Sequence, residues 1–284
     1  MQAKEIALTF DDAPRSAEGH LDGPTRAQLL IEGLKKEGAV ETAFFATSSN
    51  LDKEGMTRLE AYANAGHIIS NHAHTHPDFN QTATLDYIND FKTADRLLYK
   101  FPNFEKWFRF PYLREGNQLE KRDSMRTALL DAGYKNAYIT INTYDWYMDE
   151  QFQKEIKVNP NLDLTKMKSY YVAMLLNAVE HYDEMAIKHL GRSPKHVILL
   201  HETDTNALFL LDFVSALKAN GWNIISPREA YKDDLSNYVT PNIFKFNPGR
   251  IGEVARDKGQ TQGLWPESCD EEFLDREFKR QVLQ

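Results

Sequence analysis

The chain has very little cysteine and no long apolar run, and each shortage excludes a class of protein or site. Cys269 is the only cysteine among 284 residues, which excludes an internal disulfide and a cysteine-based zinc site. No stretch of about 18 apolar residues occurs, so we expect no transmembrane helix. Internal repeats and low-complexity segments are also missing, which argues against a solenoid.

An excess of positive charge is missing as well. Asp and Glu (42) outnumber Lys and Arg (34), and the formal net charge is -8. This balance argues against nucleic acid as a partner. No charged region followed by an apolar run opens the sequence, so we expect no signal peptide in it. The hydrophobic fraction of 42% is enough for the core of one sizeable domain or two small ones.

Apolar runs alternate with amphipathic stretches over most of the chain. We expect strands at 5–10, 42–47, 67–71, 107–110, 136–142, 196–201 and 222–226. Helical spacing of apolar residues predicts helices at 26–37, 53–65, 85–100, 118–132, 165–189 and 206–219. Strands that alternate with helices predict a parallel α/β fold, and polar residues at the strand ends favour a barrel over an open sheet. The predicted fold is therefore a distorted (β/α)7 barrel.

The pattern changes after about residue 233. Pro241, Pro248 and Gly249 interrupt the chain there, and a charged helical pattern follows at 271–283. We predict a barrel at 1–235 and a C-terminal extension at 236–284 that packs on the barrel and is not an independent domain.

Two adjacent carboxylates, Asp11 and Asp12, end the first expected strand. Neighbouring residues at a strand end point in different directions, so one carboxylate can bind a metal while the other handles a proton. An Asp pair in this place is also common as a turn or a helix cap. The pair alone leaves both interpretations open.

Three histidines follow the third expected strand: His72, His74 and His76. His72 and His76 are four residues apart, so one helical turn or a tight loop places both rings on one side. With Asp12 they would form a two-histidine, one-carboxylate set that leaves coordination positions open for water and substrate. We predict one divalent metal ion, with Zn²⁺ as the default and Co²⁺, Ni²⁺, Mn²⁺ or Fe²⁺ as alternatives. His74 points elsewhere in this geometry and is assigned a supporting or structural role.

Polar residues also end three later strands. Arg109 ends the fourth, Asp145 follows the fifth and His201 ends the sixth. A lone Arg or His in such a place is often a satisfied structural residue. In a parallel barrel, however, all these ends face the same rim, which favours a single site.

The segments 9–12, 72–77, 109–112, 145–146 and 199–201 occur in an order that resembles the five motifs of the polysaccharide deacetylase family. This family is also called the NodB-homology family or carbohydrate esterase family four. The resemblance implies a distorted barrel and a metal-dependent removal of acetyl groups from N-acetylated sugars, of the chitin or peptidoglycan type. A carbohydrate substrate of this kind would place the protein in the periplasm or outside the cell.

The resemblance also implies roles for the matching residues. Asp11 would be the general base, paired with Arg109, and His201 would be the general acid, tuned by Asp145. The metal ligands it implies are Asp12, His72 and His76. The substrate-binding residues it implies are Tyr112, whose backbone N–H would help to hold the oxyanion, and Trp146 and Leu199, which would line the acetyl pocket.

Three positions depart from the family pattern. Ala13 stands where Gly is usual, Asn142 where Asp is frequent, and Glu202 where Asp is common. A Gly in the first place permits positive φ or a close approach, so Ala13 is expected to change the local turn. None of the three removes a metal ligand or a proton carrier, so we expect them to affect substrate preference more than activity.

Other interpretations compete with this one. The pair His72 and His74 resembles the His-x-His of amidohydrolase barrels, but those place the pair after the first strand, where this chain has Asp11 and Asp12. Some relatives within the deacetylase family act on non-sugar amides such as cyclic ureides. A catalytically silent carbohydrate-binding barrel is the third alternative, although its usual mark, the loss of a metal ligand, is not found.

Overall fold

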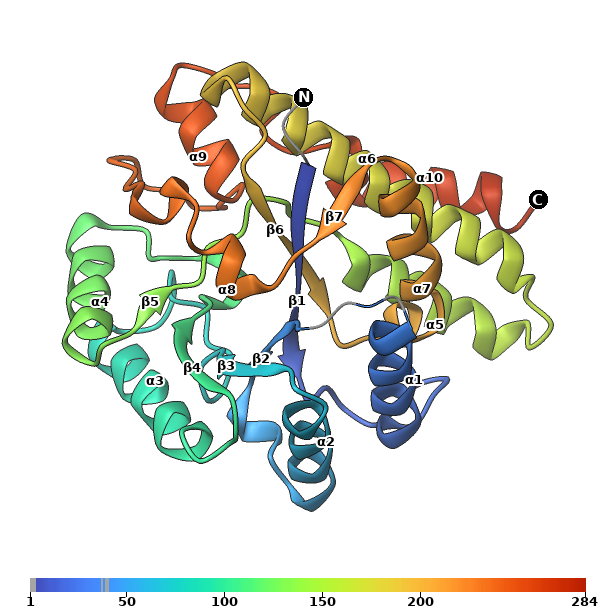
Figure 1. Cartoon of the computed structure of the whole chain (residues 1–284), viewed down its shortest axis with the longest axis horizontal. Coiled ribbons are helices and arrows are strands. Elements are labelled where there is room, and N and C mark those ends of the chain that lie inside the picture. The colour runs from blue at the N-terminus through green and yellow to red at the C-terminus, as the bar shows by residue number, and fades with distance from the viewer. Residues whose placement is uncertain (1–3, 37, 39–40) are drawn as a thin grey trace.

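A computed structural model describes residues 4–36, 38 and 41–284 and contains a parallel sheet that curves into a barrel (Figure 1). The strands are β1 (Lys4–Ala13), β2 (Ala43–Ala46), β3 (Ile68–Asn71), β4 (Phe104–Phe108), β5 (Lys135–Asn136), β6 (Lys195–His201) and β7 (Trp222–Ile224). They lie in the order β5-β4-β3-β2-β1-β6, and β7 pairs with the first residues of β1. The predicted distorted (β/α)7 barrel is confirmed.

Helices surround the strands on the outside of the barrel (Figure 1). They are α1 (Gly23–Lys36), α2 (Lys53–Asn64), α3 (Thr84–Leu98), α4 (Leu119–Asp131), α5 (Asp145–Val158), α6 (Leu164–Leu190), α7 (Asp204–Ala219), α8 (Pro227–Ala230), α9 (Arg250–Asp257) and α10 (Glu271–Gln281). Each predicted helix is present with its ends within a few residues, except that the predicted end at Glu37 lies outside the described residues. No helix in the described part of the chain has the length and hydropathy needed to cross a membrane.

Strand β1 passes through the centre of the molecule and separates two environments. Ile6, Leu8 and Phe10 belong to the main hydrophobic cluster that α1 and α7 also contribute to. The alternate residues Thr9 and Asp11 both contact the Arg109 guanidinium inside the barrel. The period of two in a strand therefore puts apolar side chains under the helices and polar ones in the interior.

The predicted strand at 136–142 is wrong in its extent. Regular pairing with β4 ends at Asn136, after which the chain crosses to β6, where Ile141 pairs with Ile198. Thr140 and Ile141 both donate their N–H groups to the carbonyl of Val197. One segment thus bonds to two strands in turn, which closes the barrel and accounts for its distortion. The fourth strand is also shifted, since β4 covers Phe104–Phe108 and not 107–110.

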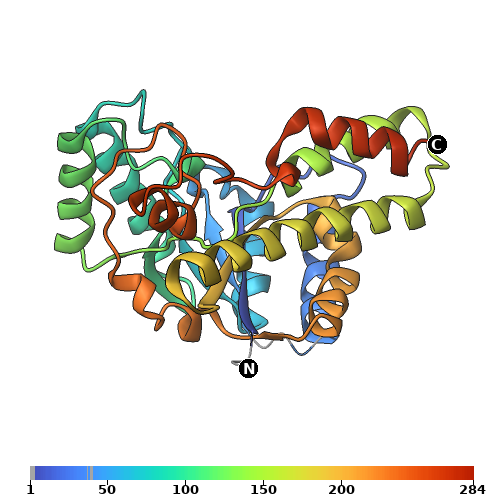
Figure 2. The ribbon, with the colours of Figure 1, turned by 90° about the horizontal axis from the view of Figure 1, so that it is seen from above.

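The segment after residue 235 packs on the barrel's helices. Helix α9 contacts α6, and α10 contacts both α6 and α5, as the view from above shows for α10 and α6 (Figure 2). Ile251, Val254 and Leu274 of this segment are buried in the main hydrophobic cluster. The boundary at 235 itself stays a prediction.

Candidate metal and active site

The predicted site residues converge on the rim at the carboxyl ends of β1, β3, β4 and β6. Asp11 lies beside His201 in the register of β1 and β6. Arg109 forms an ion pair with Asp11, and Asp12 lies close to both His72 and His76. These contacts and the strand pairing join four of the five sequence motifs, as expected for strand ends that share one rim. Asp145 of the remaining motif contacts His201 directly.

Asp12 reaches the rim because the strand breaks its alternation there. In a regular strand Asp12 would point away from Asp11. Instead its φ is 66°, and the register with β2 shifts between Phe10 and Ala13. The positive φ thus falls on Asp12 and not on Ala13, which is buried and pairs with Ala46. Ala in the place of Gly is consistent with this turn.

Asp12, His72 and His76 offer one ligand atom each, and these atoms lie within 4.8 Å of one another. Oδ1 of Asp12 is 3.4 Å from Nε2 of His72 and 3.2 Å from Nε2 of His76. This Oδ1 is buried and has no hydrogen-bond partner. Three acceptor atoms that converge without a shared donor fit a divalent cation, as the sequence predicts.

The protonation states of these groups fit a metal set. Burial raises the pKa of Asp12, but the nearby rings of His72, His201 and His76 outweigh it and hold that pKa well below its ordinary value. Burial and the neighbouring His72 lower the pKa of His76 to about 4. At neutral pH the site therefore holds a carboxylate and a neutral imidazole, the forms that bind metals.

The histidines lie on a tight loop after β3 and not on a helical turn. Ala73 and His76 have positive φ values of 68° and 56°. The ring of His74 lies 2.9 Å from the hydroxyl of Ser48, measured from Nδ1 to Oγ, and its backbone N–H donates to Asp90. His74 is thereby fixed in the loop wall, in line with the structural role expected for it.

Arg109 is buried, and its guanidinium is held on several sides. Nη1 donates to both carboxylate oxygens of Asp11, at 2.9 and 3.2 Å. Nε donates to the carbonyl of Ala137, and Nη2 donates to the hydroxyls of Thr9 and Tyr231, at 3.3 and 3.2 Å. These bonds fix the plane of the guanidinium and hence that of the Asp11 carboxylate. Thr9 and Tyr231 were not singled out from the sequence.

His201 and Asp145 form the second proton-handling pair. Asp145 is fully buried at the first position of α5, and its Oδ1 lies 2.7 Å from Nδ1 of His201. Its Oδ2 accepts the backbone N–H of His201 and the side-chain amide of Asn206, at 2.7 and 2.6 Å. Burial lowers the pKa of His201, but the Asp145 carboxylate outweighs this effect and raises it above its ordinary value. Since Nδ1 is occupied, Nε2 is the atom left to exchange a proton.

The predicted substrate-binding residues differ in exposure. Tyr112 is 55% exposed and packs edge-on against His76, with ring centroids 4.6 Å apart. Trp146 is half-buried and packs against Tyr144, with ring centroids 5.3 Å apart. Leu199 is buried on β6 two residues before His201, so both side chains point to the same side of the strand.

A buried network that the sequence did not reveal supports the loop after Asp12. Glu202 is fully buried, and its carboxylate accepts hydrogen bonds from Arg58 at 3.1 Å, from the Tyr62 hydroxyl at 2.8 Å and from the Arg15 backbone N–H. Asp204 accepts from Nε of Arg26 at 2.6 Å. These carboxylates tie β6 and α7 to α1 and α2.

The same carboxylates hold the backbone of residues 15–21. Oδ2 of Asp204 accepts the N–H of Leu21 at 2.8 Å, and Arg58 and Arg26 donate to the carbonyls of Arg15 and Ser16. The only hint in the sequence was the acidic pair that follows His201. Its basic partners lie 144 and 178 residues away in the chain, so spacing could not have identified them.

Comparisons with known proteins agree with the predicted resemblance. The family described as polysaccharide deacetylase matches residues 1–137. A peptidoglycan-N-acetylglucosamine deacetylase of Bacillus cereus is 27% identical over 143 residues, which cover 50% of this chain and 46% of the relative. The chain covers about half the length of the curated relatives it matches. The predicted family resemblance is confirmed.

Solved structures of this kind share the fold. A family 4 carbohydrate esterase from Streptomyces lividans, in complex with acetate, superposes with a TM-score of 0.51 at 19% identity, covering 80% of this chain and 95% of that one. A CE4 family pseudoenzyme from Bacillus anthracis superposes with a TM-score of 0.55 at 18% identity, covering 81% and 66%. At these identities the superpositions support the barrel and nothing beyond it.

Proposed function

We propose that this chain, which resembles the polysaccharide deacetylase family over residues 1–137, is a metal-dependent hydrolase that removes acetyl groups from N-acetylated sugars and releases acetate. The observation that carries the proposal is the arrangement of two proton-handling pairs beside one set of metal ligands. Asp11 with Arg109 lies against His72, and His201 with Asp145 lies next to Asp11 in the sheet. The relative named as a peptidoglycan-N-acetylglucosamine deacetylase supports a glycan of this type.

Asp12, His72 and His76 would hold the metal. A divalent ion there would polarise the amide carbonyl and make water a better nucleophile near neutral pH. Zn²⁺ is our first choice, and Co²⁺, Ni²⁺, Mn²⁺ and Fe²⁺ suit the same ligands.

The residues of the chain would move the protons. Asp11 accepts a proton from the attacking water, while Arg109 keeps its carboxylate in position. The Tyr112 N–H would stabilise the oxyanion that develops on the carbonyl oxygen. His201 donates a proton from Nε2 to the sugar nitrogen as the C–N bond breaks, and Asp145 stabilises the imidazolium beforehand. Acetate and a free amine leave, and Trp146 with Leu199 would line the pocket for the acetyl methyl.

The protein would act in the periplasm or outside the cell, because polymers of N-acetylated sugars are found there. Its partner is then the glycan itself. The intact set of metal ligands favours this function over silent carbohydrate binding. The relative named as a peptidoglycan-N-acetylglucosamine deacetylase favours it over hydrolysis of cyclic ureides.

A substrate panel tests the proposal. The metal-loaded protein is incubated with N-acetylglucosamine oligomers, peptidoglycan fragments and cyclic ureides, and products are identified by mass spectrometry alongside an acetate assay. We expect acetate and free amines from at least one glycan, and none from the Asp11→Asn variant with its metal still bound. Turnover of a cyclic ureide alone, or glycan binding without any product, would replace the proposed function by one of the alternatives.

A further inference from the structure

We propose that Tyr112, Arg114 and Phe246 form a stacking platform for the sugar units that flank the one being deacetylated. The proposal rests on the proposed function and adds a substrate-binding surface to it. Tyr112 comes from the loop after β4, whereas Phe246 comes from the C-terminal extension, outside the residues 1–137 that match the family. The platform would therefore make the extension part of the substrate site.

A chain of contacts leads from the metal ligands to Phe246. The Tyr112 ring lies 4.6 Å from that of His76, and the Arg114 guanidinium lies 5.1 Å from the Tyr112 ring centroid. The same guanidinium lies 5.2 Å from the Phe246 ring centroid, and the Lys245 ammonium also lies 5.2 Å from that centroid. Tyr112 is 55% exposed and Phe246 54%. Two exposed aromatic rings, with the Arg114 guanidinium in contact with both, therefore form a surface that begins beside the candidate metal site.

The loop that carries His76 also holds this platform in place. Asp78, two residues after His76, forms an ion pair with Arg114. Asn80 donates its side-chain amide to the carbonyl of Lys245 at 3.0 Å. The platform and the metal ligand are therefore anchored to one segment, so that their relative position is fixed.

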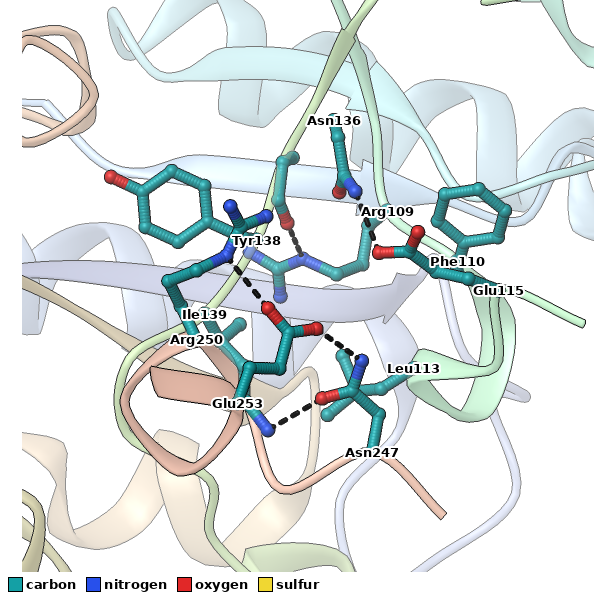
Figure 3. A pocket seen from close by; sticks show the side chains of 12 residues that line it. Arg109, Phe110, Leu113, Glu115, Asn136, Tyr138, Ile139, Asn247, Arg250 and Glu253 are labelled. Carbon is teal, nitrogen blue, oxygen red and sulfur yellow. Dashed lines mark hydrogen bonds and ion pairs between the residues drawn. The ribbon is translucent and has the colours of Figure 1, made fainter. Parts of the chain in front are cut away.

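Phe246 is exposed but does not lie on a loose loop. The next residue, Asn247, donates to Glu253 at 2.8 Å and accepts the N–H of Gly249 at 2.8 Å (Figure 3). Glu253 in turn pairs with Arg250 at 3.0 Å, and the backbone N–H of Arg250 donates to the carbonyl of Ile139. Both Arg250 and Glu253 are buried. A ring that is held before the ligand arrives loses little conformational freedom on binding.

The chemistry of the platform fits a neutral sugar chain. A pyranose with equatorial substituents has apolar C–H faces that pack on aromatic rings, and its hydroxyls can accept hydrogen bonds from a guanidinium. Asp78 balances the charge of Arg114, and Lys245 beside Phe246 adds only one positive charge, which is compatible with an uncharged sugar chain. We therefore assign the platform to a linear N-acetylglucosamine chain.

Substitution of Phe246 tests the assignment in two assays. The first assay measures the kinetics of the native protein and of Phe246→Ala with the dimer and the hexamer of N-acetylglucosamine. The second measures binding of the same ligands by calorimetric titration, with and without Phe246→Ala, in the Asp11→Asn background, where turnover is removed. We expect KM and Kd for the hexamer to rise roughly three- to tenfold, with the dimer little affected and kcat unchanged. Phe246→Tyr should restore hexamer binding. Tyr99→Ala is the matched control, since Tyr99 is 66% exposed at the C-terminal end of α3, on the opposite face of the barrel.

The two assays separate failure of the platform from failure of the proposed function. Hexamer binding that weakens in Phe246→Ala without any turnover in the native protein would support the platform and reject the deacetylase. Equal hexamer affinity in Phe246→Ala and its parent, a loss that Tyr99→Ala shares, or no hexamer binding by any variant would each reject the platform.

Discussion

Nδ1 of His72 lies 2.8 Å from the backbone carbonyl of Arg109. Since a carbonyl oxygen only accepts, Nδ1 is the donor in this bond, and Nε2 is the ring nitrogen directed at Asp12. The Arg109 side chain meanwhile holds the Asp11 carboxylate. One residue at the end of β4 thus orients both a candidate metal ligand through its backbone and the candidate base through its guanidinium.

We predict that His76→Ala lowers Zn²⁺ affinity by at least about 100-fold, because one of three converging ligand atoms is lost. Calorimetric titration of the metal-stripped protein measures this directly and needs no substrate. His74→Ala is the control, since that ring bonds Ser48 in the loop wall. Equal losses in both variants would argue that the loop has collapsed and that His76 is not a specific ligand.

We predict that Arg109→Met destabilises the fold by about 3–5 kcal/mol, because it leaves the buried Asp11 carboxylate without its partner. Urea unfolding gives the free energy. The double variant Asp11→Asn with Arg109→Met should recover part of the loss, since the unpaired charge is then removed. A single-variant loss under about 1 kcal/mol would mean that this pair behaves like an exposed one.

We predict that Asp145→Asn moves the alkaline limb of the kcat profile to lower pH. The general acid His201 must be protonated, so activity falls as pH rises through its pKa. Asp145 raises that pKa, and Asp12 and Asp11 add to the effect. Without the Asp145 charge the limb should shift down, and kcat at neutral pH should fall by up to about 100-fold. A limb that stays in place would assign it to another group.

We predict that Glu202→Gln destabilises the protein by about 3–5 kcal/mol, because the buried Arg58 loses its buried carboxylate and keeps only the more exposed Glu54 as an ionic partner. Glu54→Gln is a matched control: Glu54 pairs with the same arginine but is 36% exposed, so its loss should cost under about 1 kcal/mol. Hydrogen exchange at residues 15–21 should quicken in Glu202→Gln alone. Similar losses in both variants would show that Arg58, and not the buried carboxylate, supports the loop.

The sequence was informative where local pattern determines structure. The strands could be predicted because they are apolar runs that end in polar residues. The ends of parallel strands share one face of the sheet, and this places Asp11, His72, Arg109 and His201 at one rim. The extent of strand β5 could not be predicted, since the largely apolar run at 137–141 has the same pattern whether it pairs with one neighbour or crosses between two.

Helix α5 was missed although its signal was present. Met148, Phe152 and Ile156 are spaced four apart and are buried, as on the inner face of a helix. The aromatic residues at its start, which include Trp146, fit a substrate-binding loop as well as the first turn of a helix, so the pattern alone did not separate the two. The pairing of Tyr231 with Arg109, 122 residues apart, has no counterpart in local spacing and depends on the complete fold.

Acetate release by metal-stripped protein, with and without added Zn²⁺ or Co²⁺, is the direct test of metal-dependent deacetylation. N-acetylglucosamine oligomers are the substrate, and metal content is measured in the same samples. We expect no acetate without metal, and release in proportion to the metal bound at Asp12, His72 and His76. Absence of release with one metal bound per chain would contradict the deacetylase function, and equal release without metal would contradict the role of the metal.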